Sequence, residues 1–229
     1  MHEWKVFSDI SEASIALADY LAEQIELAIS QRGICNVLLP GGNTPVVCLR
    51  KLSEKNIAWE KVHWYLGDER CVPKSHASRN DLMLEINFWS HIPNANKYPI
   101  PAELGPEQAA VKYSEMIASI NHFDIAFLGL GEDGHTASLF PDNVALNDKH
   151  RVVPVFNSPK PPGERVSVSV DTLRDTRCRV ILTAGSAKAD VLSEIRKGED
   201  LPVNNIGDVH WFVDVAAMPI NTIESSTNT

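Results

Sequence analysis

The sequence predicts an α/β fold in which helices cover both faces of a mostly parallel sheet. Three observations lead to this class. Short apolar runs bounded by turn residues, typical of buried strands, alternate with segments of helical periodicity. Several apolar runs lead directly into loops rich in glycine or charge. No internal repeat or interdomain linker interrupts the alternation, and strands that alternate with helices favour a parallel sheet.

The first part of the chain is expected to hold one long helix and two buried strands. Asp9 is a typical N-cap residue, and Gly33 ends the helical periodicity that follows it. The apolar runs 34–39 and 61–66 predict strands. A glycine turn at 40–45, with a proline suited to the first helical turn, separates the first of these strands from a short helix.

Helical spacing recurs near 82–88 and 106–120, with proline-rich sequence between them, and a buried strand is expected at 125–128. Further strands are expected at 151–155 and at 166–170. The last of these runs alternates apolar and polar residues, as strands do when one face is solvated or lines a cleft.

Near the C-terminus, strands at 179–183 and 209–213 enclose a helix that opens at 184–188. The polar segment 221–229 is expected to be a flexible tail. The remainder, 1–220, is expected to form a single α/β domain.

Composition is that of an ordinary globular protein: of 229 residues, 44% are hydrophobic and 22% are charged. The formal net charge of −9 argues against nucleic acid or an anionic membrane as a partner. No apolar run approaches the roughly 20 residues that span a bilayer. Four cysteines without CxxC spacing, and no visible signal peptide, predict a reducing cytoplasm.

The most informative segment is 129–140, which follows the strand expected at 125–128 and places three glycines within six residues. Glycine lets backbone approach a ligand closely, and open α/β sheets bind ligands where their strands end. His135 lies just past this turn, and imidazole suits general-base chemistry near neutral pH. A tight turn whose histidine only caps a helix is the alternative. The density of glycine, carboxylate and imidazole favours a functional site.

Gly41, Gly42 and Thr44 follow the first central strand and offer backbone N–H groups, a hydroxyl and a helix N-terminus, which together suit a phosphate. The loop lacks the Gly-Lys-Ser/Thr of a nucleotide triphosphatase, and no GxGxxG follows the strand. Taken alone, the loop also fits an ordinary turn with a capping threonine.

Four cations lie in separate loops or at a helix start: Arg70, Lys160, Arg165 and Lys188. Each alone is a solvated surface charge by default, but strand ends that converge on one rim would bring them together around a phosphate. Asp68 and Glu69 fit either an exposed turn with an internal ion pair or a functional role. No third ligand accompanies Asp133 and His135, so no metal site is expected. Without a GxSxG motif, Ser138 is not expected to be a nucleophile.

Five segments resemble the 6-phosphogluconolactonase family, in the family's order. They are Pro40-Gly-Gly-Asn-Thr-Pro45, Gly67-Asp-Glu-Arg-Cys-Val-Pro73, Gly129-Leu-Gly-Glu-Asp-Gly-His-Thr-Ala-Ser-Leu-Phe-Pro141, Lys160-Pro-Pro-Gly-Glu-Arg165 and Gly185-Ser-Ala-Lys188. The resemblance implies a three-layer α/β/α fold with a Rossmann-like sheet, shared with glucosamine-6-phosphate deaminase. It also implies hydrolysis of 6-phospho-D-glucono-1,5-lactone to 6-phospho-D-gluconate in the oxidative pentose phosphate pathway, with no metal or organic cofactor.

Carried over residue by residue, the resemblance makes His135 the general base and Asp68 a carboxylate linked to catalysis or substrate placement. Gly41, Gly42 and Thr44 match the phosphate loop. The cationic substrate contacts are Arg70, Arg165 and Lys188, with Lys160 as an addition. The chain departs from the family at Arg79, where a serine is usual before Asn80, so no sugar contact is assigned to that segment.

Two other functions stay open. Deaminases of the same fold continue Gly-His into a segment with an asparagine and a glutamate, whereas 138–141 carries no carboxylate, which favours hydrolysis. A non-catalytic sugar-phosphate sensor is the second, and the presence of both His135 and Asp68 argues against it. The expected partner is a small sugar-phosphate lactone, and the expected assembly is a monomer or small homo-oligomer.

Overall fold

Seven strands form one parallel sheet in the order β1-β10-β9-β6-β2-β3-β5. The computed structural model describes residues 2–218, so the tail expected at 221–229 lies outside the described residues. The strands are β1 (Glu3–Phe7), β2 (Cys35–Leu39), β3 (Val62–Leu66), β5 (Asn96–Tyr98), β6 (Ile125–Leu128), β9 (Cys178–Thr183) and β10 (His210–Asp214).

Three further strands form a small antiparallel sheet in the order β4-β8-β7. They are β4 (Asp68–Arg70), β7 (Val152–Val155) and β8 (Arg165–Val168). The alternating run expected to be a strand over 166–170 therefore ends earlier, because Ser169 instead caps a helix by accepting a hydrogen bond from the Thr172 N–H.

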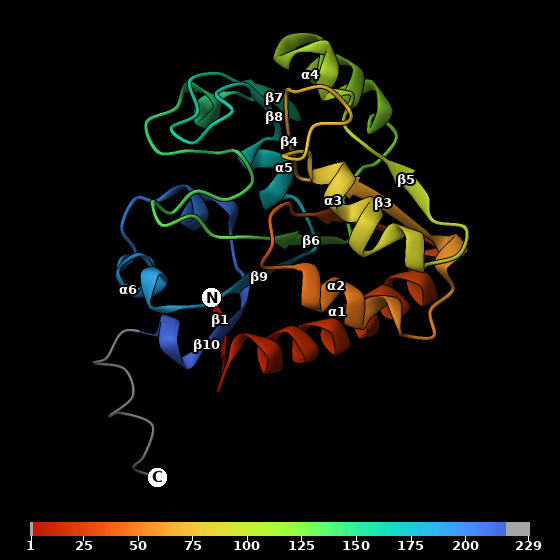
Figure 1. Cartoon of the computed structure of the whole chain (residues 1–229), viewed down its shortest axis with the longest axis vertical. Coiled ribbons are helices and arrows are strands. Elements are labelled where there is room, and N and C mark those ends of the chain that lie inside the picture. The colour runs from red at the N-terminus through yellow and green to blue at the C-terminus, as the bar shows by residue number, and fades with distance from the viewer. Residues whose placement is uncertain (1, 219–229) are drawn as a thin grey trace.

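Helices flank the large sheet, which confirms the expected three-layer α/β/α class. They are α1 (Ile10–Arg32), α2 (Val46–Ser53), α3 (Asn80–Asn87), α4 (Pro106–Met116), α5 (Val170–Arg174) and α6 (Ala189–Lys197). In Figure 1, α1 and α2 lie below β3 and β6, whereas α4 and the small sheet lie above them. The helix expected to open at 184–188 begins later, because Ser186–Lys188 forms a single 3-10 turn.

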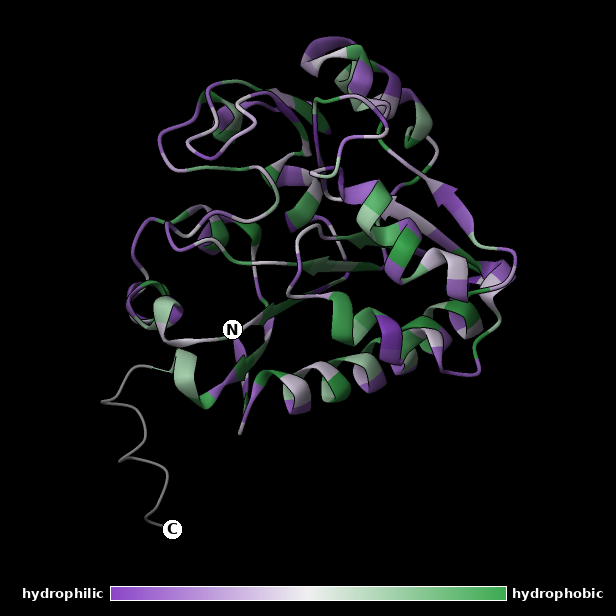
Figure 2. Ribbon diagram, viewed as in Figure 1, coloured by the Kyte–Doolittle hydropathy of each residue, from purple (hydrophilic) through white to green (hydrophobic). Residues whose placement is uncertain are grey.

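The sequence patterns set the limits of α1 and the position of the core. The Asp9 carboxylate accepts a hydrogen bond from the Glu12 N–H at 2.9 Å, and Gly33 ends the helix in the left-handed conformation. All four residues of β6 are buried, and the strand is green along its length in Figure 2. A strand covered on both faces requires this unbroken apolar run.

The patterns missed three strands: β1, β4 and β5. β4 and β5 have only three residues each, and β1 and β5 form the two edges of the large sheet, where polar residues are tolerated. The alternative of an exposed turn at Asp68 and Glu69 is wrong. These two residues are 6% and 0% exposed, because β4 pairs with β8 and other segments cover both of its faces: Asp68 contacts Ser138, and Glu69 contacts Arg79.

A buried arginine fixes β4 to the start of α3. Arg79 is 1% exposed and lies within 4 Å of three carboxylates: Glu69 at 3.5 Å, Asp81 at 2.5 Å and Glu103 at 3.4 Å. Burial raises the pKa of Glu69 to about 7, although the N–H groups of Arg70, Asn80 and Asp81 and the charge of Arg79 favour its carboxylate form. The residue that replaces the usual serine thus has a structural role.

No helix within residues 2–218 combines the length and apolarity needed to cross a membrane.

We expect Arg79→Ala to lower the free energy of unfolding by about 3–5 kcal/mol, because it leaves the buried Glu69 carboxylate without its counter-charge. Urea denaturation measures this loss. Lys51→Ala is the control, since Lys51 forms an exposed i,i+3 pair with Glu54 and should cost at most about 1 kcal/mol. Equal losses in the two variants would contradict the structural role of Arg79.

Candidate active site

A pocket lies where four parallel strands of the large sheet end. The chain moves from β2 to β3 in one direction and from β6 to β9 in the other, so the order reverses between β2 and β6. Such a switch point leaves a crevice in which open α/β sheets bind ligands. The lining includes eight of the residues singled out from the sequence: Gly41, Gly42, Thr44, Asp68, Arg70, His135, Arg165 and Lys188.

The small sheet brings one carboxylate and two cations to the same side of the pocket. In the antiparallel pair of β4 and β8, Arg70 lies opposite Arg165, and Asp68 lies opposite Ser167. Cross-strand partners point to one face, and residues two apart share a face. Asp68, Arg70 and Arg165 therefore face the pocket together, while Glu69 between them points to the Arg79 cluster.

Like charges directly opposite on paired strands are unfavourable, and backbone carbonyl groups hold the two arginines in place. Arg70 donates to the Ser78 carbonyl at 2.6 Å, and Arg165 donates to the carbonyl groups of Lys160 (2.8 Å) and Pro162 (3.2 Å). Burial lowers the pKa of Arg165, the Asp68 charge opposes this change, and the Arg70 charge adds to it. Two cations held on opposite positions of paired strands are suited to bind an anion.

Lys188 extends the positive charge to the other side of the pocket. Its Nζ donates to the Leu130 carbonyl at 2.9 Å, which joins the start of α6 to the loop after β6. Burial lowers the pKa of Lys188, and the charge of Lys160 lowers it further, against Glu132 and Asp133. Lys160 itself is exposed and does not line the pocket, so its substrate contact stays a prediction.

The loop after β2 presents unpaired backbone donors. Within residues 2–218, the N–H groups of Gly41, Gly42 and Thr44 meet no acceptor. Gly41 also permits a close approach, since a Cβ there would lie 1.8 Å from Oδ1 of Asn80. Asn80 in turn donates to the Asp68 carbonyl at 2.9 Å, which links this loop to β4. Free N–H groups that line the same pocket as three cations suit a phosphate.

His135 is oriented by Asp133. Its Nδ1 contacts Oδ1 of Asp133, and an ionised carboxylate can only accept, so Nδ1 carries the ring proton and donates a hydrogen bond to Asp133 while Nε2 is the unprotonated nitrogen. The ring packs against Phe140 at a centroid distance of 4.4 Å. Gly131 makes the pair possible, because a Cβ there would lie 1.9 Å from Nδ1 of His135. The geometry therefore supports a role for Asp133 in orienting His135.

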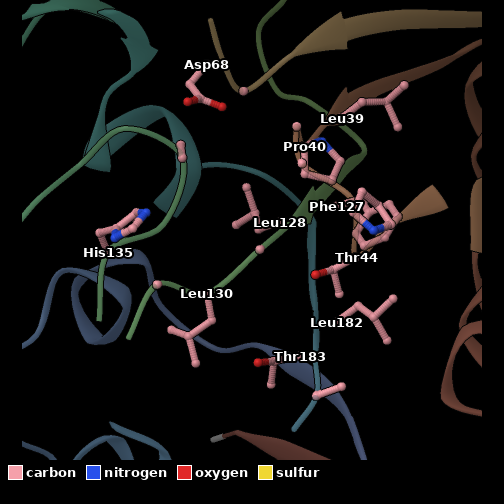
Figure 3. A pocket seen from close by; sticks show the side chains of 18 of the residues that line it. Leu39, Pro40, Thr44, Asp68, Phe127, Leu128, Leu130, His135, Leu182 and Thr183 are labelled. Atoms are coloured by element: carbon pink, nitrogen blue, oxygen red, sulfur yellow. The ribbon is translucent and has the colours of Figure 1, made fainter. Parts of the chain in front are cut away.

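Burial lowers the pKa of His135, and Lys160 lowers it too, whereas Asp133 and Asp68 act to raise it. The result is an imidazole that stays neutral at neutral pH and can accept a proton. In Figure 3, Leu128 lies at the centre of the pocket lining, with His135 on one side and Thr44 on the other. His135 and the loop at 41–44 thus line separate parts of one pocket.

Sequence patterns did not single out Asn80 or Ser138 as partners of Asp68, although both contact its carboxylate. Ser138 lies inside the segment 129–140, but no spacing rule reveals a contact between residues 70 positions apart in the sequence. Among the described residues, no group of three or more His, Cys, Asp or Glu side chains is arranged to hold a metal ion.

We expect His135 to titrate below pH 6.5, the ordinary imidazole value, because burial outweighs the Asp133 carboxylate. NMR of the imidazole carbons during a pH titration measures this. Asp133→Asn should move the midpoint further down, since it removes the group that favours the protonated ring. A midpoint at or above 6.5, or an upward movement in Asp133→Asn, would contradict the described environment.

Comparisons with known proteins show the family to which the chain belongs. Residues 8–212 match the family described as glucosamine-6-phosphate isomerases/6-phosphogluconolactonase. A 6-phosphogluconolactonase of Mycobacterium leprae is 34% identical over 211 residues, which cover 85% of each chain. One from a Synechocystis species is 35% identical over 212 residues, which cover 85% of this chain and 88% of the relative.

Solved structures of the same fold cover most of the chain. A 6-phosphogluconolactonase from Thermotoga maritima has a TM-score of 0.87 at 28% identity, covering 93% of this chain and 100% of its own. A monomeric glucosamine-6-phosphate deaminase has a TM-score of 0.81 at 18% identity, covering 94% of this chain and 98% of its own, and shows a shared fold alone. The chain belongs to the glucosamine-6-phosphate isomerase/6-phosphogluconolactonase family.

Proposed function

We propose that this chain hydrolyses 6-phospho-D-glucono-1,5-lactone to 6-phospho-D-gluconate. Its relatives are named after this reaction, which is a step of the oxidative pentose phosphate pathway. One observation carries the proposal: three cations and an imidazole oriented by Asp133 line the same pocket. The cations and the loop at 41–44 suit the phosphate, and the imidazole suits the lactone carbonyl.

His135 is the proposed general base. Nε2 takes a proton from water as the water oxygen bonds to the carbonyl carbon, and Asp133 stabilises the imidazolium that results. The bond from that carbon to the ring oxygen then breaks, and the imidazolium returns a proton to the ring oxygen as the alcohol forms. A lactone carbonyl is electrophilic already, so this route needs neither a covalent nucleophile nor a metal.

The phosphate contacts supply orientation. Arg70, Arg165 and Lys188 would hold the phosphate and thereby fix the carbonyl carbon next to the water on His135. Asp68 faces the same space and would accept hydrogen bonds from sugar hydroxyl groups or from the water.

We expect His135→Ala to lower kcat by about 10²–10⁴ with a small change in KM, the usual contribution of a positioned base. The assay is proton release from freshly generated 6-phosphogluconolactone, corrected for spontaneous hydrolysis. His150→Ala is a matched control: His150 contacts Asp148 at 2.7 Å in the same Asp-x-His spacing, but its side chain is 85% exposed. Wild-type turnover in His135→Ala would remove this residue from the role of base.

Arg70→Ala and Lys188→Ala should chiefly raise KM, by about 10- to 100-fold, because each removes a charge-assisted contact to phosphate. Lys197→Ala, at an exposed cation in the last turn of α6, should leave KM unchanged. Calorimetry with 6-phosphogluconate checks the same losses without turnover. Unchanged affinity in the first two variants would contradict the phosphate site.

Deamination of glucosamine 6-phosphate is the second candidate, because the family and the fold include deaminases. The segment 138–141 supplies no carboxylate near His135, which favours hydrolysis. Ammonia release from glucosamine 6-phosphate separates the two activities. A single catalytic domain over 1–220, a cytoplasmic location and a monomeric or small homo-oligomeric state stay predictions.

A further inference from the structure

The Asp68 carboxylate is held through both of its oxygens by groups from other segments. Asn80 Nδ2 lies 3.3 Å from Oδ1, and the Ser138 hydroxyl donates to Oδ2 at 2.5 Å. Asp68 is 6% exposed and Ser138 is 0% exposed, so water competes little for these bonds. Hydrogen bonds to an ionised, buried acceptor are strong and directional. The two donors therefore fix the plane of this carboxylate in the pocket.

The same hydroxyl also contacts the opposite charge. Nη1 of Arg165 lies 3.5 Å from Oγ of Ser138, and a hydroxyl can accept from one group while it donates to another. Guanidinium, hydroxyl and carboxylate thus form a chain, with the serine between the two charges. Among the described residues, no ion pair within 4.0 Å joins Asp68 to Arg165.

Ser138 does not reach the substrate itself. It is fully buried, it is absent from the pocket lining, and its proton is directed at a carboxylate that lines the pocket. Its backbone N–H donates to Ser167 Oγ at 3.3 Å, which fixes it to β8 beside Arg165. It also lies three positions after His135, so one loop carries both the proposed base and the group that holds Asp68.

We infer that Ser138 is a positioning residue for the proposed lactone hydrolysis, on which this inference rests. Its hydroxyl fixes Asp68 and separates it from Arg165, which leaves the guanidinium to bind the anionic substrate. Without the hydroxyl, Arg165 pairs directly with Asp68, because a buried arginine and carboxylate form a strong ion pair when nothing stands between them. Both side chains are then withdrawn from the substrate.

The test compares Ser138→Ala with the wild type. We expect kcat/KM for 6-phosphogluconolactone to fall by about 10- to 100-fold, which is the effect of losing a hydrogen bond to a charged group. Most of this fall should come from a higher KM. Affinity for 6-phosphogluconate, measured by calorimetry, should fall by at least about tenfold. Ser138→Cys keeps a side chain at this position, but the thiol is only a weak hydrogen-bond donor. This variant should therefore show the same loss of affinity.

A double-mutant cycle separates positioning from a general structural effect. In an Asp68→Asn background, where Arg165 has no carboxylate to pair with, Ser138→Ala should change the affinity for 6-phosphogluconate less than threefold. Ser169→Ala is the control for loss of a buried serine hydroxyl, because Ser169 is 0% exposed and caps α5. It should lower the melting temperature while leaving KM unchanged.

Three results would overturn the inference: wild-type affinity in Ser138→Ala, equal losses in both Asp68 backgrounds, or full function in Ser138→Cys. An inactive wild type would refute the proposed hydrolysis instead. The calorimetric cycle with 6-phosphogluconate would then still decide the role of Ser138.

Discussion

The antiparallel register between β4 and β8 is the constraint on which the candidate site depends. It sets Arg70 opposite Arg165 and Asp68 opposite Ser167, so that one face of a two-strand ladder carries the charged side of the pocket. A shift of one residue would turn all of these side chains to the other face. Glu69 points to the face of β4 that is turned away from the pocket. There it binds Arg79 and the N–H groups of Asn80 and Asp81, and these contacts prevent such a shift.

The large sheet supplies the rest of the site through its topology. Loops after β2 and β6 flank the point where strand order reverses, and they carry Gly41, Gly42 and His135. The protein has a net charge of −9, yet Arg70, Arg165 and Lys188 line this one pocket. Backbone carbonyl groups hold these cations in place, so the pocket carries local positive charge in a protein of negative net charge, as the proposed phosphate site requires.

Most of the parallel sheet was predictable, because strands buried on both faces leave unbroken apolar runs such as that of β6. The short strand β4 was not predictable, because the sequence Asp-Glu-Arg is typical of an exposed turn and only the pairing with β8 makes it a strand. Pocket residues were found because glycines and charges follow strand ends. Their partners were not, because the contacts of Ser138 with Asp68 and of Asn80 with Gly41 join segments that are distant in sequence.

A crystal structure with 6-phosphogluconate bound tests the central claim most directly. The account places the phosphate among Arg70, Arg165, Lys188 and the N–H groups of the loop at 41–44, with the C1 carboxylate within about 2.6–3.2 Å of His135 Nε2 or one water away. A phosphate bound outside this cluster, or a C1 carboxylate turned away from His135, would contradict it.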